Sequence, residues 1–157
     1  MNLAEFEQIQ NRYFQASQEI MKMDISLLIK YLRDINNSYV ILRALSSLDF
    51  STIKLNEEPL FDEIVYLSIK GNSTQILWSR KIVKNINRDY LFQKLGNSIK
   101  TILENVGIEC EYADYYYRNI ADLFYELDFK DELKIFLDKY CKNSTDINIR
   151  EIYDDYI

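Results

Sequence analysis

The feature that most constrains this chain is its shortage of residues that end or turn secondary structure. Only three glycines and one proline occur in 157 residues. A β-sheet protein needs turns every 8–12 residues or so, roughly one per strand, and glycine and proline supply many of them. Long helices joined by short connections need far fewer. The sequence therefore predicts an all-α fold.

Length and composition indicate a single domain over residues 1–157. The chain has the size of one common domain, and 48% of its residues are hydrophobic and 14% aromatic. That apolar content is enough for one substantial core and is unlike that of a disordered chain.

Apolar residues recur at steps of three and four along most of the chain, which is typical of amphipathic helices. The pattern predicts about seven helices, the first over about Leu3–Met21 and the second running from a cap at Asp24 to Leu45 with a bend near Asn36–Ser38. Pro59 suits the first turn of a later helix, and Gly107 suits a cap at the end of another. Because the connections are short, we expect antiparallel helix pairs in a HEAT-like helical bundle.

Residues Ile64–Trp78 have two interpretations. Ile-Val-Tyr-Leu is rich in β-forming residues, and Gly-Asn-Ser-Thr could form the turn of a hairpin. The strict alternation of a half-buried hairpin is absent, so two helices separated near Gly71 are favoured.

The residues that side-chain catalysis most often requires are missing. The chain has no histidine. Enzymes with a Ser-His or Cys-His nucleophile, and most enzymes with a catalytic zinc site, are therefore not expected. Its glycines are isolated, so no phosphate-binding loop is expected. Cys110 and Cys141 fit free thiols better than a disulfide framework. We therefore expect no enzyme activity, no cofactor and no metal, with a carboxylate metal site or acid–base pair as the less favoured alternative.

Charge divides the chain into two unequal parts. Residues 1–100 carry 13 Lys and Arg against 11 Asp and Glu, whereas residues 101–157 carry 6 against 14. An acidic surface repels phosphate backbones and attracts basic proteins, so we expect a basic protein partner and no direct binding of nucleic acid. The alternative is that the acidic residues serve solubility alone.

A cluster of tyrosines lies within this acidic part, at 112, 115, 116 and 117. If Tyr116 faces the core with Ile120 and Leu123, the opposite stripe of the helix is exposed. Tyrosine is common at protein interfaces, so the exposed stripe is a candidate binding surface. The alternative, which the sequence favours, is that these tyrosines flank the core. The candidate partner-binding residues are Glu109, Glu111, Asp114, Tyr115, Arg118, Asp122, Tyr125 and Glu126.

Other features point to an intracellular binding protein. No basic segment followed by an apolar run opens the sequence, and no apolar stretch is long enough for a membrane span, so a cytoplasmic protein with no membrane contact is expected. The basic residues Arg80, Lys81, Lys84 and Arg88 have helical spacing and are interpreted as one solvated face.

Three segments, PLFDEIVYLSIKGN at 59–72, YYYRNIADLFYELD at 115–128 and STDINIREIYDDY at 144–156, together resemble small helical bacterial proteins with HEAT-like helix pairs. Among these the chain most resembles immunity proteins of contact-dependent inhibition and related toxin systems. The resemblance covers about Pro59–Ile157 and implies a cytoplasmic protein that binds a cognate basic toxin domain, such as a nuclease, and blocks its active site. The alternative is a non-catalytic helical adaptor or regulatory protein-binding module.

Overall fold

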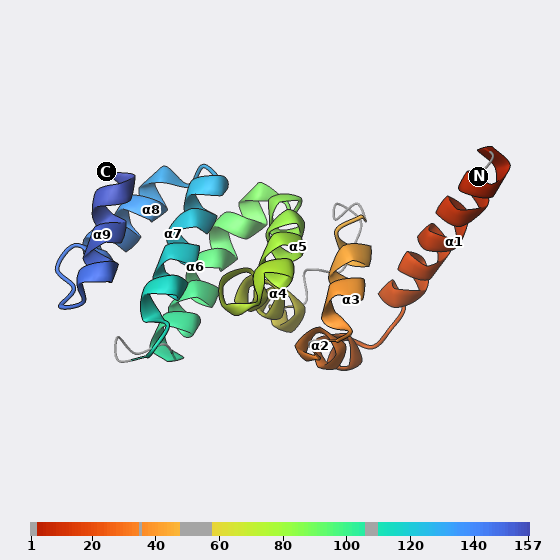
Figure 1. Ribbon diagram of the computed structural model, residues 1–157, viewed down its shortest axis with the longest axis horizontal. Helices are drawn as coiled ribbons and strands as arrows, with labels where there is room; N and C mark the ends of the chain where they lie inside the picture. The colour runs from red at the N-terminus through yellow and green to blue at the C-terminus, as the bar shows by residue number, and fades with distance from the viewer. Residues whose placement is uncertain (1–2, 35, 48–57, 106–109) are drawn as a thin grey trace.

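The computed structural model describes residues 3–34, 36–47, 58–105 and 110–157 (Figure 1). Every regular element in these residues is helical and none is a strand, which confirms the all-α prediction. The helices are α1 (Leu3–Met21), α2 (Ile25–Arg33), α3 (Ser38–Leu45), α4 (Glu58–Lys70), α5 (Ser73–Lys84), α6 (Arg88–Asn105), α7 (Ala113–Glu126), α8 (Lys130–Phe136), the π-helix η1 (Leu137–Cys141) and α9 (Ile147–Tyr156).

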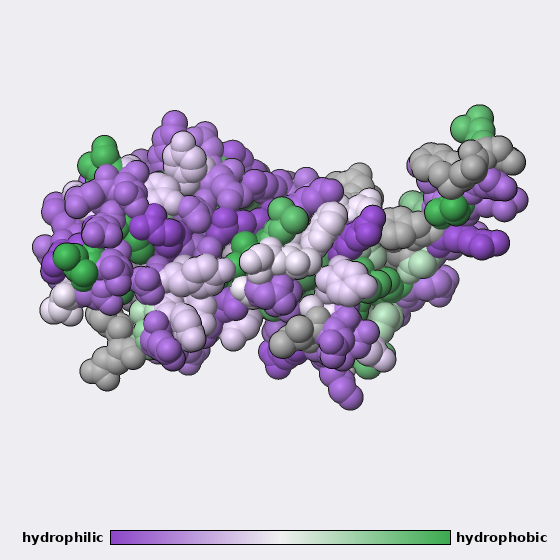
Figure 2. Space-filling model, viewed as in Figure 1, coloured by the Kyte–Doolittle hydropathy of each residue, from purple (hydrophilic) through white to green (hydrophobic). Residues whose placement is uncertain are grey.

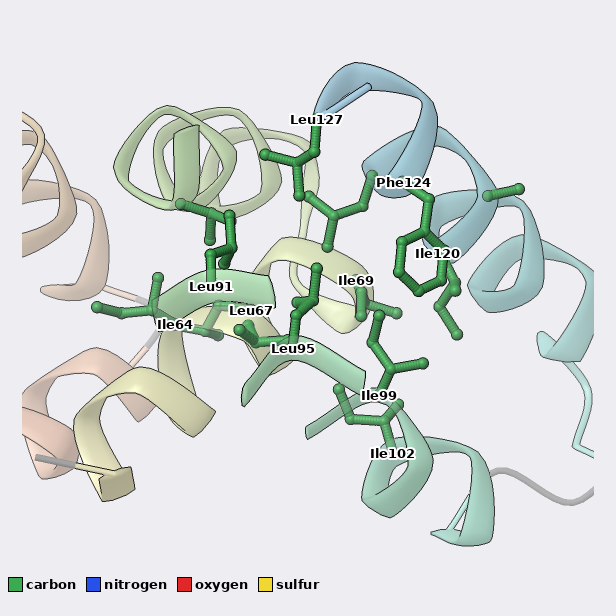
Figure 3. Packing of buried hydrophobic residues seen from close by; sticks show 14 of the residues in the cluster. Ile64, Leu67, Ile69, Leu91, Leu95, Ile99, Ile102, Ile120, Phe124 and Leu127 are labelled. Carbon is green, nitrogen blue, oxygen red and sulfur yellow. The ribbon is translucent and has the colours of Figure 1, made fainter. Parts of the chain in front are cut away.

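The chain runs along the long axis of the molecule, with α1 at one end and α9 at the other (Figure 1). In the middle, α4 contacts α2, α5, α6 and α7. The buried apolar side chains form one cluster that extends from Leu28 to Ile152. Figure 3 shows its central part, where side chains of α4, α6 and α7 meet. The antiparallel, HEAT-like pairing of the helices remains a prediction.

The contested residues Ile64–Trp78 are helical, in α4 and α5, and the hairpin interpretation is wrong. Asn72 caps α5 by accepting hydrogen bonds from the backbone N–H groups of Thr74 and Gln75, while the Gln75 side chain accepts one from the N–H of Asn72. This reciprocal pair satisfies N–H groups that lack a partner at a helix start. Gly71 precedes it, in a space where a Cβ would lie 2.5 Å from the carbonyl oxygen of Leu67.

The predicted long helix over residues 24–45 is two helices, α2 and α3. Asp24 caps α2 as expected, accepting a 2.9 Å hydrogen bond from the N–H of Ser26. The helix ends at Asp34, whose side chain accepts from the N–H of Asn36 and from the side chain of Asn37. Short polar side chains compete with helical backbone hydrogen bonds in this way, so the expected bend is a break.

Helices α4 and α9 begin with residue types suited to a helix start. Pro59 lies in the first turn of α4, and Asp146 caps α9 by accepting a 2.8 Å hydrogen bond from the N–H of Asn148. Between α7 and α8, Asp128 has a positive φ of 56° and allows the chain to reverse. The predicted cap at Gly107 lies outside the described residues. Within the described residues, no helix is long and apolar enough to cross a membrane.

Candidate protein-binding surface

Tyr117, and not Tyr116, is the tyrosine of α7 that enters the core. Tyr117 is 4% exposed, and its ring lies 5.9 Å from that of Phe136 and 6.4 Å from that of Tyr140, between centroids. Tyr116 is half-buried, with the ammonium of Lys70 4.8 Å from its ring centroid. Burial raises the pKa of both phenols. Both tyrosines have helical spacing from Ile120, so the sequence alone does not separate them.

The predicted binding residues do not form one open face. Those at the start of α7 are accessible: Glu111 and Tyr115 are exposed, and Asp114 is half-buried. Farther along the helix, the other predicted residues contact α9 or α5. Glu109 lies outside the described residues.

Three of the predicted residues, Arg118, Asp122 and Tyr125, hold α9 against α7. The Arg118 guanidinium donates a 2.7 Å hydrogen bond to Asp155, which raises the arginine pKa. The Tyr156 hydroxyl donates to the Asp122 carboxylate. Burial, together with that hydrogen bond, raises the pKa of Tyr156. The ring of Tyr125 lies 5.8 Å from that of Tyr156, yet Tyr125 is still 69% exposed.

Glu126, the last predicted residue, belongs to an ionic network with α5. Its carboxylate lies 2.6 Å from the Arg80 guanidinium and 2.6 Å from the Lys84 ammonium. Burial raises the pKa of Glu126, but the hydrogen bond from Lys84 and the charge and hydrogen bond of Arg80 outweigh it, and the pKa lies below its ordinary value. Glu126 is therefore ionised at neutral pH.

Arg80 itself contradicts the interpretation of residues 80–88 as one solvated face. Arg80 is only 8% exposed and donates to the backbone carbonyl of Ser68 at 3.3 Å and to that of Asn119 at 3.0 Å. The Asn119 side chain accepts from Arg80 and donates to the carbonyl of Ile69. Carbonyls in the last turn of a helix lack intrahelical partners, so Arg80 and Asn119 together complete the end of α4.

The structure adds a C-terminal pocket that the sequence reasoning missed. This pocket has a volume of about 720 Å³, within the range typical of ligand sites. It lies among α7, α8, η1 and α9 and is lined by Tyr125, Asp128, Lys130, Leu133, Lys134, Leu137, Tyr153, Tyr156 and Ile157. Four separate segments contribute to it, so helical periodicity within any one of them gives no signal for it.

The lining of the C-terminal pocket carries two lysines and one carboxylate, Asp128. Both pocket lysines are paired, Lys134 with Asp138 at 2.7 Å and Lys130 with Asp128 at 3.3 Å. In contrast, four exposed carboxylates make no ion pair with any described residue; these are Glu111, Asp131, Glu151 and Asp154. Figure 2 shows that hydrophilic residues dominate the visible face over α6–α9.

Cys141, in η1, is a buried free thiol. Burial raises the pKa of the Cys141 thiol to about 12, so it is protonated at neutral pH and is a poor nucleophile. Among the described residues, no cluster of three carboxylate or thiol ligands is placed to hold a metal ion. The pocket offers aromatic surface from Tyr125, Tyr153 and Tyr156.

A second feature outside the predicted site is the buried carboxylate of Glu63 on α4. Glu63 is 5% exposed, and its Oε2 accepts hydrogen bonds from Nε and Nη2 of Arg33 at 3.0 and 2.7 Å. Its Oε1 makes no hydrogen bond with any described residue. The pair links α2 to α4 beside a groove of about 300 Å³, lined in part by Tyr66, which is in the volume range of small ligand sites.

Comparison with protein-family models, with curated proteins and with solved structures found no match to this chain.

Proposed function

We propose that this protein is a non-catalytic inhibitor that binds a basic protein partner through the surface around its C-terminal pocket. The specific form of the proposal is an immunity protein that neutralises a cognate bacterial toxin domain, such as a nuclease, by covering its active site. The observation that carries the proposal is the tyrosine-lined pocket of about 720 Å³, in the third of the chain that also has exposed carboxylates without ion pairs to described residues.

The residue types of this surface suit recognition of basic side chains. Exposed carboxylates accelerate the approach of a positively charged protein and disfavour acidic competitors. A guanidinium or ammonium that reaches the pocket would lie against the rings of Tyr125, Tyr153 and Tyr156, and such cation–π contacts are worth about 0.5–2 kcal/mol each. Tyrosine also adds contact area while losing little side-chain entropy.

The test is direct binding to the toxin domain encoded beside this gene, measured by isothermal titration calorimetry. We expect Tyr125→Ala to weaken binding by about 30-fold, as for an interface hot spot of about 2 kcal/mol. Tyr39→Ala is the matched control, because Tyr39 is a 49% exposed tyrosine on α3, far from the pocket in the sequence and in Figure 1. It should leave the affinity unchanged.

Two results would contradict the proposal. One is the absence of complex formation together with no protection of cells that express the toxin domain. The other is equal weakening by Tyr125→Ala and Tyr39→Ala, which would place the interface elsewhere. Binding without inhibition of the toxin would support the alternative of an adaptor.

A further inference from the structure

The buried side chain of Glu63 on α4 has one carboxylate oxygen that is bonded and one that is not. Its Oε2 accepts both hydrogen bonds from Arg33, whereas its Oε1 is buried and has no donor among the described residues. A buried acceptor without a donor is costly, and folded proteins satisfy nearly all such groups. Oε1 is therefore the atom of this carboxylate that a ligand with a donor would satisfy.

An ammonium group on the same face of α4 has no counter-ion. Lys70 follows Glu63 by seven residues and Tyr66 by four, so the three side chains lie one above another along the helix. The Lys70 ammonium lies 5.3 Å from the ring centroid of Tyr66 and 4.8 Å from that of Tyr116. It forms no ion pair with any described carboxylate. The two rings hold the ammonium in place, and its charge remains available to an anion.

Two grooves border these groups. The first groove, of about 300 Å³, and a second groove, of about 450 Å³, have four lining residues in common, which are Arg33, Glu63, Tyr66 and Lys70. The first groove also has an apolar wall that includes Ile29 and Ile102. Both volumes are in the range of small ligand sites. A small molecule seated where the grooves adjoin therefore borders the Glu63 carboxylate, the Lys70 ammonium and the apolar wall.

We propose that these grooves bind a small carboxylate that carries a neutral hydrogen-bond donor, such as a hydroxyl, beside its carboxyl group. The donor bonds to Oε1 of Glu63, and the carboxylate of the ligand pairs with the Lys70 ammonium. The ligand approaches past Arg33 and Tyr66, which are exposed and line both grooves. This site shares no lining residue with the C-terminal pocket.

The charges of the grooves indicate where each end of the ligand lies. The lining of the second groove has two cationic side chains, Arg33 and Lys70, against the single carboxylate of Glu63. This excess of positive charge favours the anionic end of the ligand. The first groove adds the carboxylate of Asp62, which accepts a 2.5 Å hydrogen bond from the Ser98 hydroxyl, so its charges balance. The apolar part of the ligand therefore lies in the first groove.

The first experiment titrates the isotope-labelled full chain with phenyllactate, which has a hydroxyl beside its carboxylate and an apolar ring. We expect saturable shifts of backbone amide signals in α2 and α4, with a dissociation constant on the order of 1 mM. Hydrocinnamate is the same molecule without the hydroxyl. It should bind about tenfold more weakly, because the hydrogen bond to the carboxylate oxygen is lost. This pair of ligands tests the contact with Glu63 without any change to the protein.

The second experiment repeats the titration with three variants. Lys70→Met should weaken phenyllactate binding about tenfold, because the ligand carboxylate loses its cation. Lys81→Met is the matched control and should change nothing, since the Lys81 ammonium also lies over an aromatic ring, 5.0 Å from the centroid of Trp78, but lines neither groove. Glu63→Gln should reduce the difference between phenyllactate and hydrocinnamate to less than about twofold, because one acceptor oxygen is replaced by a donor. Circular dichroism checks that each variant is folded.

Three results would overturn the proposal. They are the absence of saturable shifts in α2 and α4 up to about 20 mM phenyllactate, equal affinity for phenyllactate and hydrocinnamate, and equal weakening by Lys70→Met and Lys81→Met. If Glu63→Gln does not fold, the comparison of the two ligands on the natural protein still decides whether a donor is recognised. No toxin domain is present in these titrations, so their outcome is independent of the proposed inhibitor function.

Discussion

The helices α1 and α4 are both amphipathic, yet they occupy opposite environments. Eight of the 13 residues of α4 are buried, and the helix contacts α2, α5, α6 and α7. The longer α1 has no buried residue among those whose side chains are described. The difference teaches that an apolar stripe predicts a helix equally well in both places. Whether the helix is part of a core depends on how many neighbours the chain brings to it.

The largest expected effect comes from the ionic network at the end of α4, where a buried position can be compared with its exposed neighbour. Replacing Arg80 by Met removes one of the two cationic partners of Glu126 and leaves the Ser68 carbonyl and Asn119 without their donor. Each hydrogen bond lost from the buried guanidinium, with its acceptor left unsatisfied, costs about 1–3 kcal/mol, so we expect the free energy of unfolding in urea to fall by about 3–5 kcal/mol in total. Lys81→Met, at the exposed neighbouring position, should change it by less than about 0.5 kcal/mol. Equal effects would show that Arg80 is solvated.

The contrast between α1 and α4 is tested directly by the same truncation in each helix. Ile64 in α4 is fully buried, so Ile64→Ala should lower the free energy of unfolding by about 2–5 kcal/mol. Ile9 in α1 is 55% exposed, so Ile9→Ala should lower it by less than about 0.5 kcal/mol when measured at low micromolar concentration. A large loss in Ile9→Ala under these conditions would mean that α1 packs on the body of its own chain.

Two glycines give smaller effects of opposite sign, Gly71 at the junction between α4 and α5 and Gly96 inside α6. At Gly71 a Cβ would lie 2.5 Å from the Leu67 carbonyl oxygen and 2.7 Å from the Gln75 Cβ, so Gly71→Ala should destabilise by about 1–3 kcal/mol. At Gly96, inside α6, nothing lies within 4 Å of the added carbon. Gly96→Ala should stabilise by about 0.5–1 kcal/mol, because alanine favours helix. Thermal unfolding of both variants measures the difference.

The smallest expected effect is a pH dependence. The pKa of Glu126 is lowered in the folded protein, so its contribution to stability is present above its ordinary value of 4.5 and is lost as pH falls through the folded pKa. We expect urea unfolding midpoints of the natural protein to fall between about pH 5 and pH 3 more steeply than those of Glu126→Gln. The difference between the two profiles isolates Glu126 from the other carboxylates. Parallel profiles would mean that Arg80 and Lys84 do not stabilise the ionised form.

Much of the local structure was predictable, because its causes lie within a few residues. The sequence predicts Asp24 as a helix cap and a break between helices near Gly71, and both are confirmed, since the capping side chains of Asp24 and Asn72 act on backbone groups two or three positions away. The sequence predicts only a bend between α2 and α3, because competition between side-chain and helical hydrogen bonds is decided by small differences in energy.

The candidate site was less predictable, because its neighbours are distant in sequence. Arg80 looked like part of a solvated face, and the partners that bury it come from α4 and α7. The inward tyrosine was assigned as Tyr116, whereas the aromatic rings of Phe136 and Tyr140 receive Tyr117. Tyr125 was a predicted site residue, but the pocket beside it needs residues of four segments.

The sequence by itself determined that this protein is helical, where most of its helices begin, and that its C-terminal third is acidic. These properties follow from turn residues, spacing and charge, all of which act locally or sum over the chain. Only the tertiary structure decided which stripe of α7 is covered, that Arg80 is buried, and that α1 is left exposed. Those outcomes depend on packing between residues that are distant in the sequence. A helix with two apolar stripes buries the stripe that its neighbouring helices contact.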